Sequence, residues 1–264
     1  MRIRNFSKCV LLRLFALCIT VNAAVAESAT IKAIQDRGSI RVALAEAYPA
    51  QFIDIADNEW KGMNVEMAKE LASILDVKLE IVTTNFATII PGLLNDNYDI
   101  IMADIFATPK RALVVSFSLP YNALGTSVVV AEDFPGTEWE NLNDSSITIA
   151  NLTGSAATEI IKLDMPKATR RDIVADNLYL LHAEVASGRA DATITDHFTN
   201  LEYIKTNPDA GLKILGDIQK YPTGFAYAVR PNDTHFLQFL NTWIRYKETN
   251  GSLARLRKEW YGFD

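Results

Sequence analysis

The stretch that decides the fold is GMNVEMAKELASILDVKLEIV, residues 62–82. Its first part carries apolar residues at helical spacing with lysine and glutamate between them, which predicts a helix over residues 62–75. Residues 77–82 then alternate apolar and charged side chains, which predicts a strand. A helix that leads directly into a strand is the unit from which mainly parallel α/β sheets are built.

The same rhythm extends in both directions from this stretch. Strands are expected over residues 39–44 and 98–103 and a short helix over 88–95, so the first part reads β-α-β-α-β. A second series of alternating strands and helices is expected over residues 146–150, 154–163, 172–174, 177–187, 190–195 and 199–206. The two series predict two α/β units, each with a parallel sheet and helices on both faces.

The last part of the chain has no unit of its own to join. It predicts a strand over residues 225–229 and a helix over 236–260 with a break near Asn250-Gly251. These elements can complete the first unit by returning to it, which would make the first domain discontinuous. The periodicity permits this arrangement but does not require it.

The first 26 residues have the pattern of a secretory signal peptide. A basic start precedes an apolar run over residues 10–21, and Ala24-Val25-Ala26 has the A-x-A form of a cleavage site. The run is interrupted by Arg13 and is shorter than the roughly 20 residues of a membrane span. We therefore expect cleavage and export, with a retained membrane anchor as the alternative.

Removal of this segment changes the composition in two ways. It takes away both cysteines, Cys9 and Cys18, so the expected mature chain can form no disulfide. It also takes away four basic residues and no acidic ones, so the formal net charge goes from −6 to −10. Such an acidic chain argues against nucleic-acid binding, because phosphate backbones attract positive charge. The three histidines, His182, His197 and His235, lack the paired spacing of metal ligands, and we expect neither a metal nor another cofactor.

A series of short motifs runs through the chain from about residue 38 to residue 262. They are SIRV at 39–42, YP at 48–49, GMNVEMAK at 62–69, IIPGL at 89–93, YDII at 98–101, TPKR at 108–111, FSLPY at 117–121, GRADA at 188–192 with Asp196, and the ending that contains Trp260-Tyr261. In this order they resemble the bacterial extracellular solute-binding proteins of the polar amino-acid type, family 3, which serve ABC importers. Each motif alone is a weak signal, whereas the ordered set is a strong one.

The resemblance implies a periplasmic binding protein-like II fold, in which two α/β lobes are joined by two crossing strands. Lobe one is expected at residues 27–121 and 225–264, and residues 1–26 are expected to be the signal peptide. Lobe two is expected at 122–224 with hinge strands at its ends, near residues 121–125 and 220–224. The ligand would lie in the cleft between the lobes, which close on it about a hinge.

The resemblance also implies a function in the periplasm. The protein is expected to capture a small amino-acid-like or amine-bearing carboxylate ligand and to deliver it to the permease of an ABC transporter. We expect a monomer with no nucleic-acid partner. A ligand-sensing module for a membrane receptor is an alternative, because a receptor reads lobe closure in the same way as an importer.

Three parts of the expected site follow from matching positions in the family. Arg111 is expected to grip the ligand carboxylate, since a guanidinium offers two parallel N–H donors; an exposed helical arginine is the alternative. Gly154-Ser155-Ala156 opens the expected helix, where free N–H groups hold an anion, unless Ser155 or Thr153 is an ordinary N-cap. Asp196 is expected to pair with the ligand ammonium or, alternatively, to cap the next helix.

Other positions concern the ligand's amine and side chain. Tyr48 and Phe86 are expected to wall the side chain, with core packing as the alternative for Phe86. Glu46 adjoins the position where the family often has an acidic residue, and Phe106 stands where it often has a small hydroxyl residue. Asp104 adds a carboxylate beside Phe106. Two carboxylates facing one site favour a cation, so we expect the amine to meet Asp104 and Asp196.

The second half also resembles periplasmic cyclohexadienyl dehydratases, which are enzymes on the same fold. Their general-acid glutamate would fall at Thr199, and a threonine cannot act as a tuned carboxylic acid. The sequence therefore favours a binding protein over an enzyme. Asp104 or Glu46 could replace the missing acid, and the dehydratase stays open as an alternative.

Overall fold

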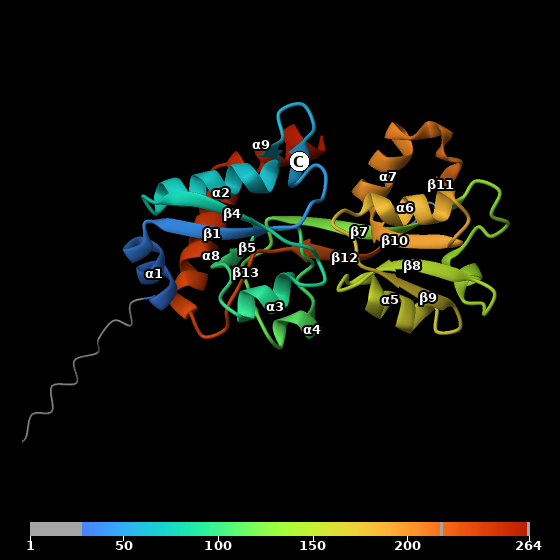
Figure 1. Cartoon of the computed structure of the whole chain (residues 1–264), viewed down its shortest axis with the longest axis horizontal. Coiled ribbons are helices and arrows are strands. Elements are labelled where there is room, and N and C mark those ends of the chain that lie inside the picture. Colours follow the sequence, from blue (N-terminus) through green and yellow to red (C-terminus); the bar gives the residue numbers. More distant parts are fainter. Residues whose placement is uncertain (1–27, 217–218, 263–264) are drawn as a thin grey trace, which may run out of the picture.

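The computed structural model describes residues 28–216 and 219–262. Two α/β lobes lie side by side, and strands β7 and β12 run between them (Figure 1). We call the part that contains the five-stranded sheet lobe one and the part that contains the six-stranded sheet lobe two. The expected signal peptide lies outside the described residues.

Lobe one is built from both ends of the described chain. Its elements are α1 (Ala29–Arg37), β1 (Ser39–Leu44), β2 (Phe52–Asp54), β3 (Glu59–Lys61), α2 (Met63–Ile74), β4 (Lys78–Thr83), α3 (Ile89–Leu94), β5 (Ile100–Ile101), α4 (Pro109–Ala112), β6 (Ser116–Phe117), β13 (Ala228–Val229), α8 (Thr234–Thr249) and α9 (Ser252–Tyr261). The strand order of its sheet is β4-β1-β5-β13-β6.

Helix α2 comes from the stretch that decides the fold, and it packs against the sheet of lobe one. Met63, Met67 and Leu71 are fully buried in the core cluster of this lobe. The chain then returns as β4, which pairs in parallel with β1 from Ser39↔Lys78 to Leu44↔Thr83. Burial of such side chains contributes roughly 1.5–3 kcal/mol each, so this unit anchors the lobe.

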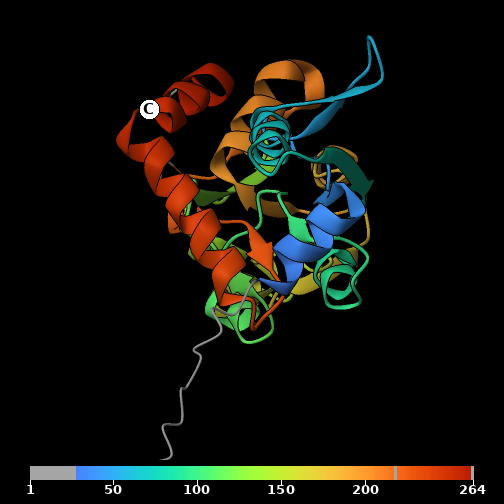
Figure 2. The ribbon, with the colours of Figure 1, turned by 90° about the vertical axis from the view of Figure 1, so that its left-hand side faces the viewer.

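The last part of the chain completes the sheet of lobe one. Strand β13 pairs antiparallel with β5 and with β6, through Ala228↔Ile101 and Ala228↔Phe117. Helix α8 then buries Phe236 and Leu240 against this lobe, and α8 and α9 lie along one side of the molecule (Figure 2). Residues on either side of lobe two in the sequence therefore share one sheet and one core.

Lobe two carries the middle of the chain. Its elements are β7 (Asn122–Ala131), η1 (Trp139–Leu142), β8 (Thr148–Leu152), α5 (Ala157–Asp164), β9 (Thr169–Ile173), α6 (Tyr179–Ala186), β10 (Ala192–Asp196), α7 (His197–Thr206), η2 (Pro208–Ala210), β11 (Leu212–Ile214) and β12 (Lys220–Phe225). Strands β10, β8 and β9 pair in parallel, whereas β7 pairs antiparallel with β10, β11 and β12.

The connection between the lobes is an antiparallel pair of strands. The start of β7 lies beside the end of β12, with Asn122↔Phe225 and Ala123↔Gly224 as partners, and the register shifts between Lys220 and Thr223. Tyr221, within this irregular part, has φ 54. The two segments that connect the lobes, β7 and β12, therefore run side by side at the place where the lobes can turn relative to each other.

Several expectations need correction. The expected strand over 225–229 is two strands in different sheets, because β12 ends at Phe225 and β13 begins at Ala228. Both sheets are mixed rather than purely parallel, since β13 pairs antiparallel with β5 in lobe one and β7 pairs antiparallel with β10 in lobe two. The helix expected from residue 154 begins at Ala157.

Candidate functional site

A pocket lies between the two lobes. The space within it, counted with the open solvent at its mouth, is about 670 Å³. Its wall is mostly apolar, with polar groups from both lobes. The lining residues are Ala47, Tyr48, Phe86, Asp104, Ile105, Phe106, Arg111, Thr126, Leu152, Ser155, Ala156, Ala157, Leu178, Leu181, Ile194, Thr195, Asp196, Thr199, Phe225 and Tyr261.

Arg111 supplies the pocket's positive charge. It lies on the short helix α4, whose N-cap Thr108 accepts a hydrogen bond from the Arg111 N–H. Its Nη1 donates to Phe106 O at 2.9 Å and its Nη2 to Gly154 O at 2.7 Å. Burial lowers the pKa of Arg111 to about 10, so it stays charged at neutral pH. Within the described residues, no carboxylate lies at ion-pair distance from this guanidinium.

Contacts across the cleft show that the lobes are closed. Besides the Arg111–Gly154 hydrogen bond, Lys110 Nζ of lobe one lies 2.6 Å from Glu159 Oε1 of lobe two. Gly154 approaches lobe one so closely that an added Cβ would lie 2.5 Å from Phe86 O. Glu46 forms an isolated β-bridge with Asn177. These contacts hold α4 and the loops of lobe one against the start of α5 and the loop before α6.

Asp104 is a carboxylate fixed by three donors of lobe one. Its Oδ1 accepts from Asn64 Nδ2 at 2.7 Å and from the Tyr121 hydroxyl, and its Oδ2 accepts from the Tyr261 hydroxyl at 2.6 Å. Burial raises the pKa of Asp104 to about 6, against the lowering effect of these three hydrogen bonds, and nearby Asp196 raises it further. A carboxylate has about four acceptor positions, so one remains for a ligand.

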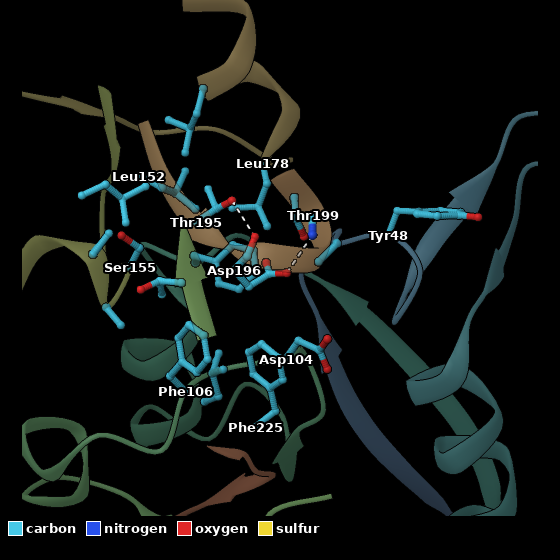
Figure 3. A pocket seen from close by; sticks show the side chains of 18 of the residues that line it. Tyr48, Asp104, Phe106, Leu152, Ser155, Leu178, Thr195, Asp196, Thr199 and Phe225 are labelled. Carbon is cyan, nitrogen blue, oxygen red and sulfur yellow. Dashed lines mark hydrogen bonds between the residues drawn. The ribbon is translucent and has the colours of Figure 1, made fainter. Parts of the chain in front are cut away.

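Asp196 faces the same pocket from lobe two. It ends β10 and is the N-cap of α7, where its Oδ1 accepts from the Thr199 N–H at 2.8 Å. Asp196 therefore caps α7, as the alternative interpretation expected, and it also lines the pocket. Burial raises the pKa of Asp196. Across the pocket from it lie Asp104, Phe106 and Phe225 (Figure 3).

Aromatic rings form much of the remaining wall. Phe106 stacks on Phe225 of β12, with ring centroids 4.5 Å apart and planes at 14°. Phe86 is buried and packs in a core cluster while it lines the pocket, so the core alternative and the pocket position both hold. Tyr48 keeps 39% of its surface exposed and lies against Phe52. The phenyl ring of Phe106 fills space at the wall of the pocket and can form no conventional hydrogen bond with a ligand.

Eight of the ten expected site residues line one pocket, and two do not. Gly154 lies beside it and presents its carbonyl to Arg111. Glu46 lies in an adjoining pocket with Asn177 and Tyr179, and burial raises its pKa. The expectation for the loop at residue 154 also changes in detail. The Ser155 N–H donates to Leu152 O, and the N-cap of α5 is Ala156, without a side-chain cap, so neither Ser155 nor Thr153 caps this helix.

The sequence alone did not identify the group that holds Asp104. Asn64, Tyr121 and Tyr261 come from α2, the crossing segment and the last turn of α9, which no local pattern connects. Thr199, which stands where a dehydratase would need a glutamate, lines the pocket. The ending that contains Trp260-Tyr261 was the available signal for Tyr261, although it predicted no contact.

Comparison with known proteins now identifies the family. The profile of the bacterial extracellular solute-binding proteins, family 3, matches residues 40–263. The chain belongs to this family. The resemblance found in the sequence and the expected fold class are thereby confirmed.

Three relatives show the range of this family. A probable amino-acid ABC transporter-binding protein of Haemophilus influenzae is 30% identical over 77% of this chain and 77% of its own length. A cyclohexadienyl dehydratase of Pseudomonas aeruginosa is 22% identical over 89% of this chain and 87% of the enzyme. The solved structure of an ancestral arginine-binding protein bound to arginine superposes with a TM-score of 0.77 at 28% identity, covering 85% of this family 3 protein and 99% of that chain.

Two further observations concern the described residues of this solute-binding protein. None of its helices between residues 28 and 216 or 219 and 262 is long and apolar enough to cross a bilayer. Over the same ranges, no group of three or more histidine, cysteine, aspartate or glutamate side chains is placed to hold a metal ion. The charged side chains that line the pocket are Arg111, Asp104 and Asp196, and they lie beside its aromatic wall.

Proposed function

We propose that this protein captures a small amino-acid-like or amine-bearing carboxylate ligand in the cleft and delivers it to an ABC importer. The observation that carries the proposal is Arg111, a partly buried cation that lines the pocket and has no carboxylate partner among the described residues. Leaving such a charge unpaired is costly. A ligand carboxylate would provide the missing partner.

The pocket supports a defined orientation of the ligand. Guanidinium has five N–H donors, and Arg111 gives two hydrogen bonds to protein carbonyls, so donors remain for a ligand carboxylate. The amine would then lie toward Asp104 and Asp196. The side chain of the ligand would meet the rings of Phe86, Phe106 and Tyr48. Ligands with both a carboxylate and an amine therefore suit this pocket better than ligands that carry only one of these groups.

The cellular setting follows from the family and from the first 26 residues. We propose export through a cleaved signal peptide, a periplasmic location and docking of the closed form on a transporter permease. We also propose that the protein works as a monomer, with lobe one at residues 27–121 and 225–264 and lobe two at 122–224. The pairing of β13 with β5 and β6 supports this division.

A ligand screen tests the proposed function. Thermal unfolding is followed with the twenty L-amino acids, simple amines and organic acids, because a ligand that binds only the folded state raises the melting temperature. We expect increases for one or more amino acids and none for amines that lack a carboxylate. A screen in which amines alone stabilise the protein would contradict the role of Arg111.

Replacing Asp104 tests how the amine is held. We expect Asp104→Asn to weaken binding of the amino acid found in the screen by about tenfold, or ~1.4 kcal/mol, because a charged partner of the amine becomes neutral. The affinity is measured by isothermal titration calorimetry. Asp144→Asn, at an exposed turn of lobe two, is the control. Unchanged affinity in Asp104→Asn would show that Asp104 does not meet the amine.

The affinity should also depend on pH. Asp104 has a pKa of about 6, so it loses its negative charge as the pH falls through that value, while Arg111 stays charged. We therefore expect the affinity for the same amino acid to fall between pH 7 and pH 5, and Asp104→Asn to flatten that decline. If the affinity of the variant declines by the same amount, the titration of another group, such as His197 beside Asp196, causes the decline.

A second candidate function is supported by one observation. Asp104 is a pocket carboxyl whose pKa lies near 6, which suits a general acid, and the family includes a cyclohexadienyl dehydratase. Against it, Asp104 already accepts three protein hydrogen bonds, and Thr199 occupies the expected position of the acid. Incubation with prephenate separates the two functions: formation of phenylpyruvate would establish the enzyme.

A further inference from the structure

Tyr261, the last residue of α9, links the pocket to the closing contact between the lobes. Its hydroxyl donates to Asp104 Oδ2 at 2.6 Å, and its side chain lines the pocket. Its ring meets Phe198 of α7 edge to face, with centroids 5.0 Å apart and planes at 71°. One side chain therefore touches the carboxylate of lobe one and an aromatic ring of lobe two.

Helix α9 holds Tyr261 in place relative to lobe one. Arg257 Nη1 donates to Tyr121 O at 3.0 Å, directly before β7 begins. Trp260 Nε1 donates to Glu66 Oε1 of α2 at 3.1 Å. The hydroxyl of Tyr261 is thus aimed at Asp104 by contacts with α2 and with the start of the crossing strand, and these contacts do not involve lobe two.

Phe198 of α7 is the residue of lobe two that the ring of Tyr261 contacts. It lies two residues after Asp196 on α7, and it packs against the core cluster of lobe one although it belongs to lobe two. It is not among the residues that line the pocket. Opening of the cleft would separate Phe198 from Tyr261 and, at the same time, carry Asp196 away from Asp104.

The two pocket aspartates make closure depend on charge. Asp104 and Asp196 come from opposite lobes, and the negative charge of Asp196 raises the cost of ionising Asp104. A cation between them removes this cost. The other ionisable or charged groups around the two carboxylates are Tyr121, Tyr227 and Tyr261 near Asp104, His197 and Tyr179 near Asp196, and Arg111 in the same pocket.

We propose that Tyr261 is a positioning residue that acts through Asp104: its hydroxyl orients the carboxylate that receives the ligand's cationic group, and its ring completes the closed cleft against Phe198. The C-terminal helix thereby couples occupation of the pocket to closure of the lobes. This inference rests on the proposed function in one respect, namely that a ligand amine lies between Asp104 and Asp196.

The test uses protons as the probe, so it needs no identified ligand. The radius of gyration of the ligand-free protein is measured by small-angle X-ray scattering from pH 8 to pH 5. We expect it to decrease as Asp104 becomes neutral. Tyr261→Phe removes one donor to the ionised carboxylate and keeps the ring, so the midpoint of this change moves up by roughly one pH unit. Phe198→Ala leaves Asp104 untouched, so the protein is more open at every pH and the midpoint stays in place.

Conservative variants separate these roles from general damage to the fold. Phe198→Leu restores part of the closure, and His197→Gln removes the histidine that also titrates near this range. The proposal is overturned if Tyr261→Phe has the midpoint of the parent protein, or if Phe198→Ala shifts the midpoint by the same amount. Calorimetry with L-arginine and the other amino acids is run in parallel. If none binds while Tyr261→Phe still shifts the midpoint, the proposed function fails and the positioning role of Tyr261 stands.

Discussion

Arg111→Ala should abolish measurable binding of any carboxylate ligand, with a loss of at least about 100-fold, or ~2.7 kcal/mol. The guanidinium is the positive group of the pocket, and its remaining N–H donors are the ones available to a carboxylate. The affinity is measured by calorimetry for the amino acid found in the screen and compared with that of the parent protein.

The stability of the ligand-free variant separates this loss from misfolding. Arg111 pays a desolvation cost, visible in its lowered pKa, and its removal should leave the free energy of unfolding of the empty protein nearly unchanged. Arg111→Lys keeps the charge but loses the planar pair of donors, so its affinity should lie between those of the parent and Arg111→Ala. Retained affinity in Arg111→Ala would remove the carboxylate clamp from the proposal.

Gly154→Ala should weaken binding of every ligand by about 100-fold, or ~2.7 kcal/mol, by preventing full closure. The new Cβ would lie 2.5 Å from Phe86 O and 3.1 Å from Ala87 Cα, and these are backbone atoms of the opposite lobe. The lobes must separate to relieve the overlap, and the hydrogen bond from Arg111 to Gly154 O is then lost. Scattering should show a larger radius of gyration with ligand present.

Gly188→Ala is a matched control for this variant. Gly154 and Gly188 both have positive φ, +82 and +70, so alanine costs each about 1–2 kcal/mol of stability. A Cβ at Gly188, however, meets nothing within 4 Å. We expect similar losses of stability in the two variants and a loss of affinity in Gly154→Ala alone. Equal affinities would show that the approach of Gly154 to Phe86 is not needed for binding.

The sequence predicted the regular parts of the fold because they follow local periodicity. The strand at residues 39–44 and the helix at 62–75 appear within a residue of their expected bounds. Only the start of the ten-residue strand β7 was predicted, as a crossing strand. The rest was not, because β7 pairs with β10, β11 and β12 along its length and has no single alternating pattern. The helix expected at residue 154 begins three residues later, since the Ser155 N–H closes a turn onto Leu152.

The site was predictable where residue type and motif carried the chemistry. Arg111 and Asp196 stand at ends of elements that face the cleft, so their position could be read from the order of motifs. The surroundings of Asp104 could not be predicted, because its donors are 40, 17 and 157 residues away in the sequence. Which hydroxyls reach a buried carboxylate is decided by tertiary packing.

The return of β13, α8 and α9 to lobe one has a consequence for how the protein is made. A chain that is synthesised from its N-terminus presents the first part of lobe one early, yet that sheet still lacks β13 and its core still lacks Phe236 and Leu240. Lobe two has all its strands before then. The first lobe to be synthesised is therefore the last that can finish folding, and Tyr261 reaches Asp104 only after lobe two and helix α9 have been synthesised.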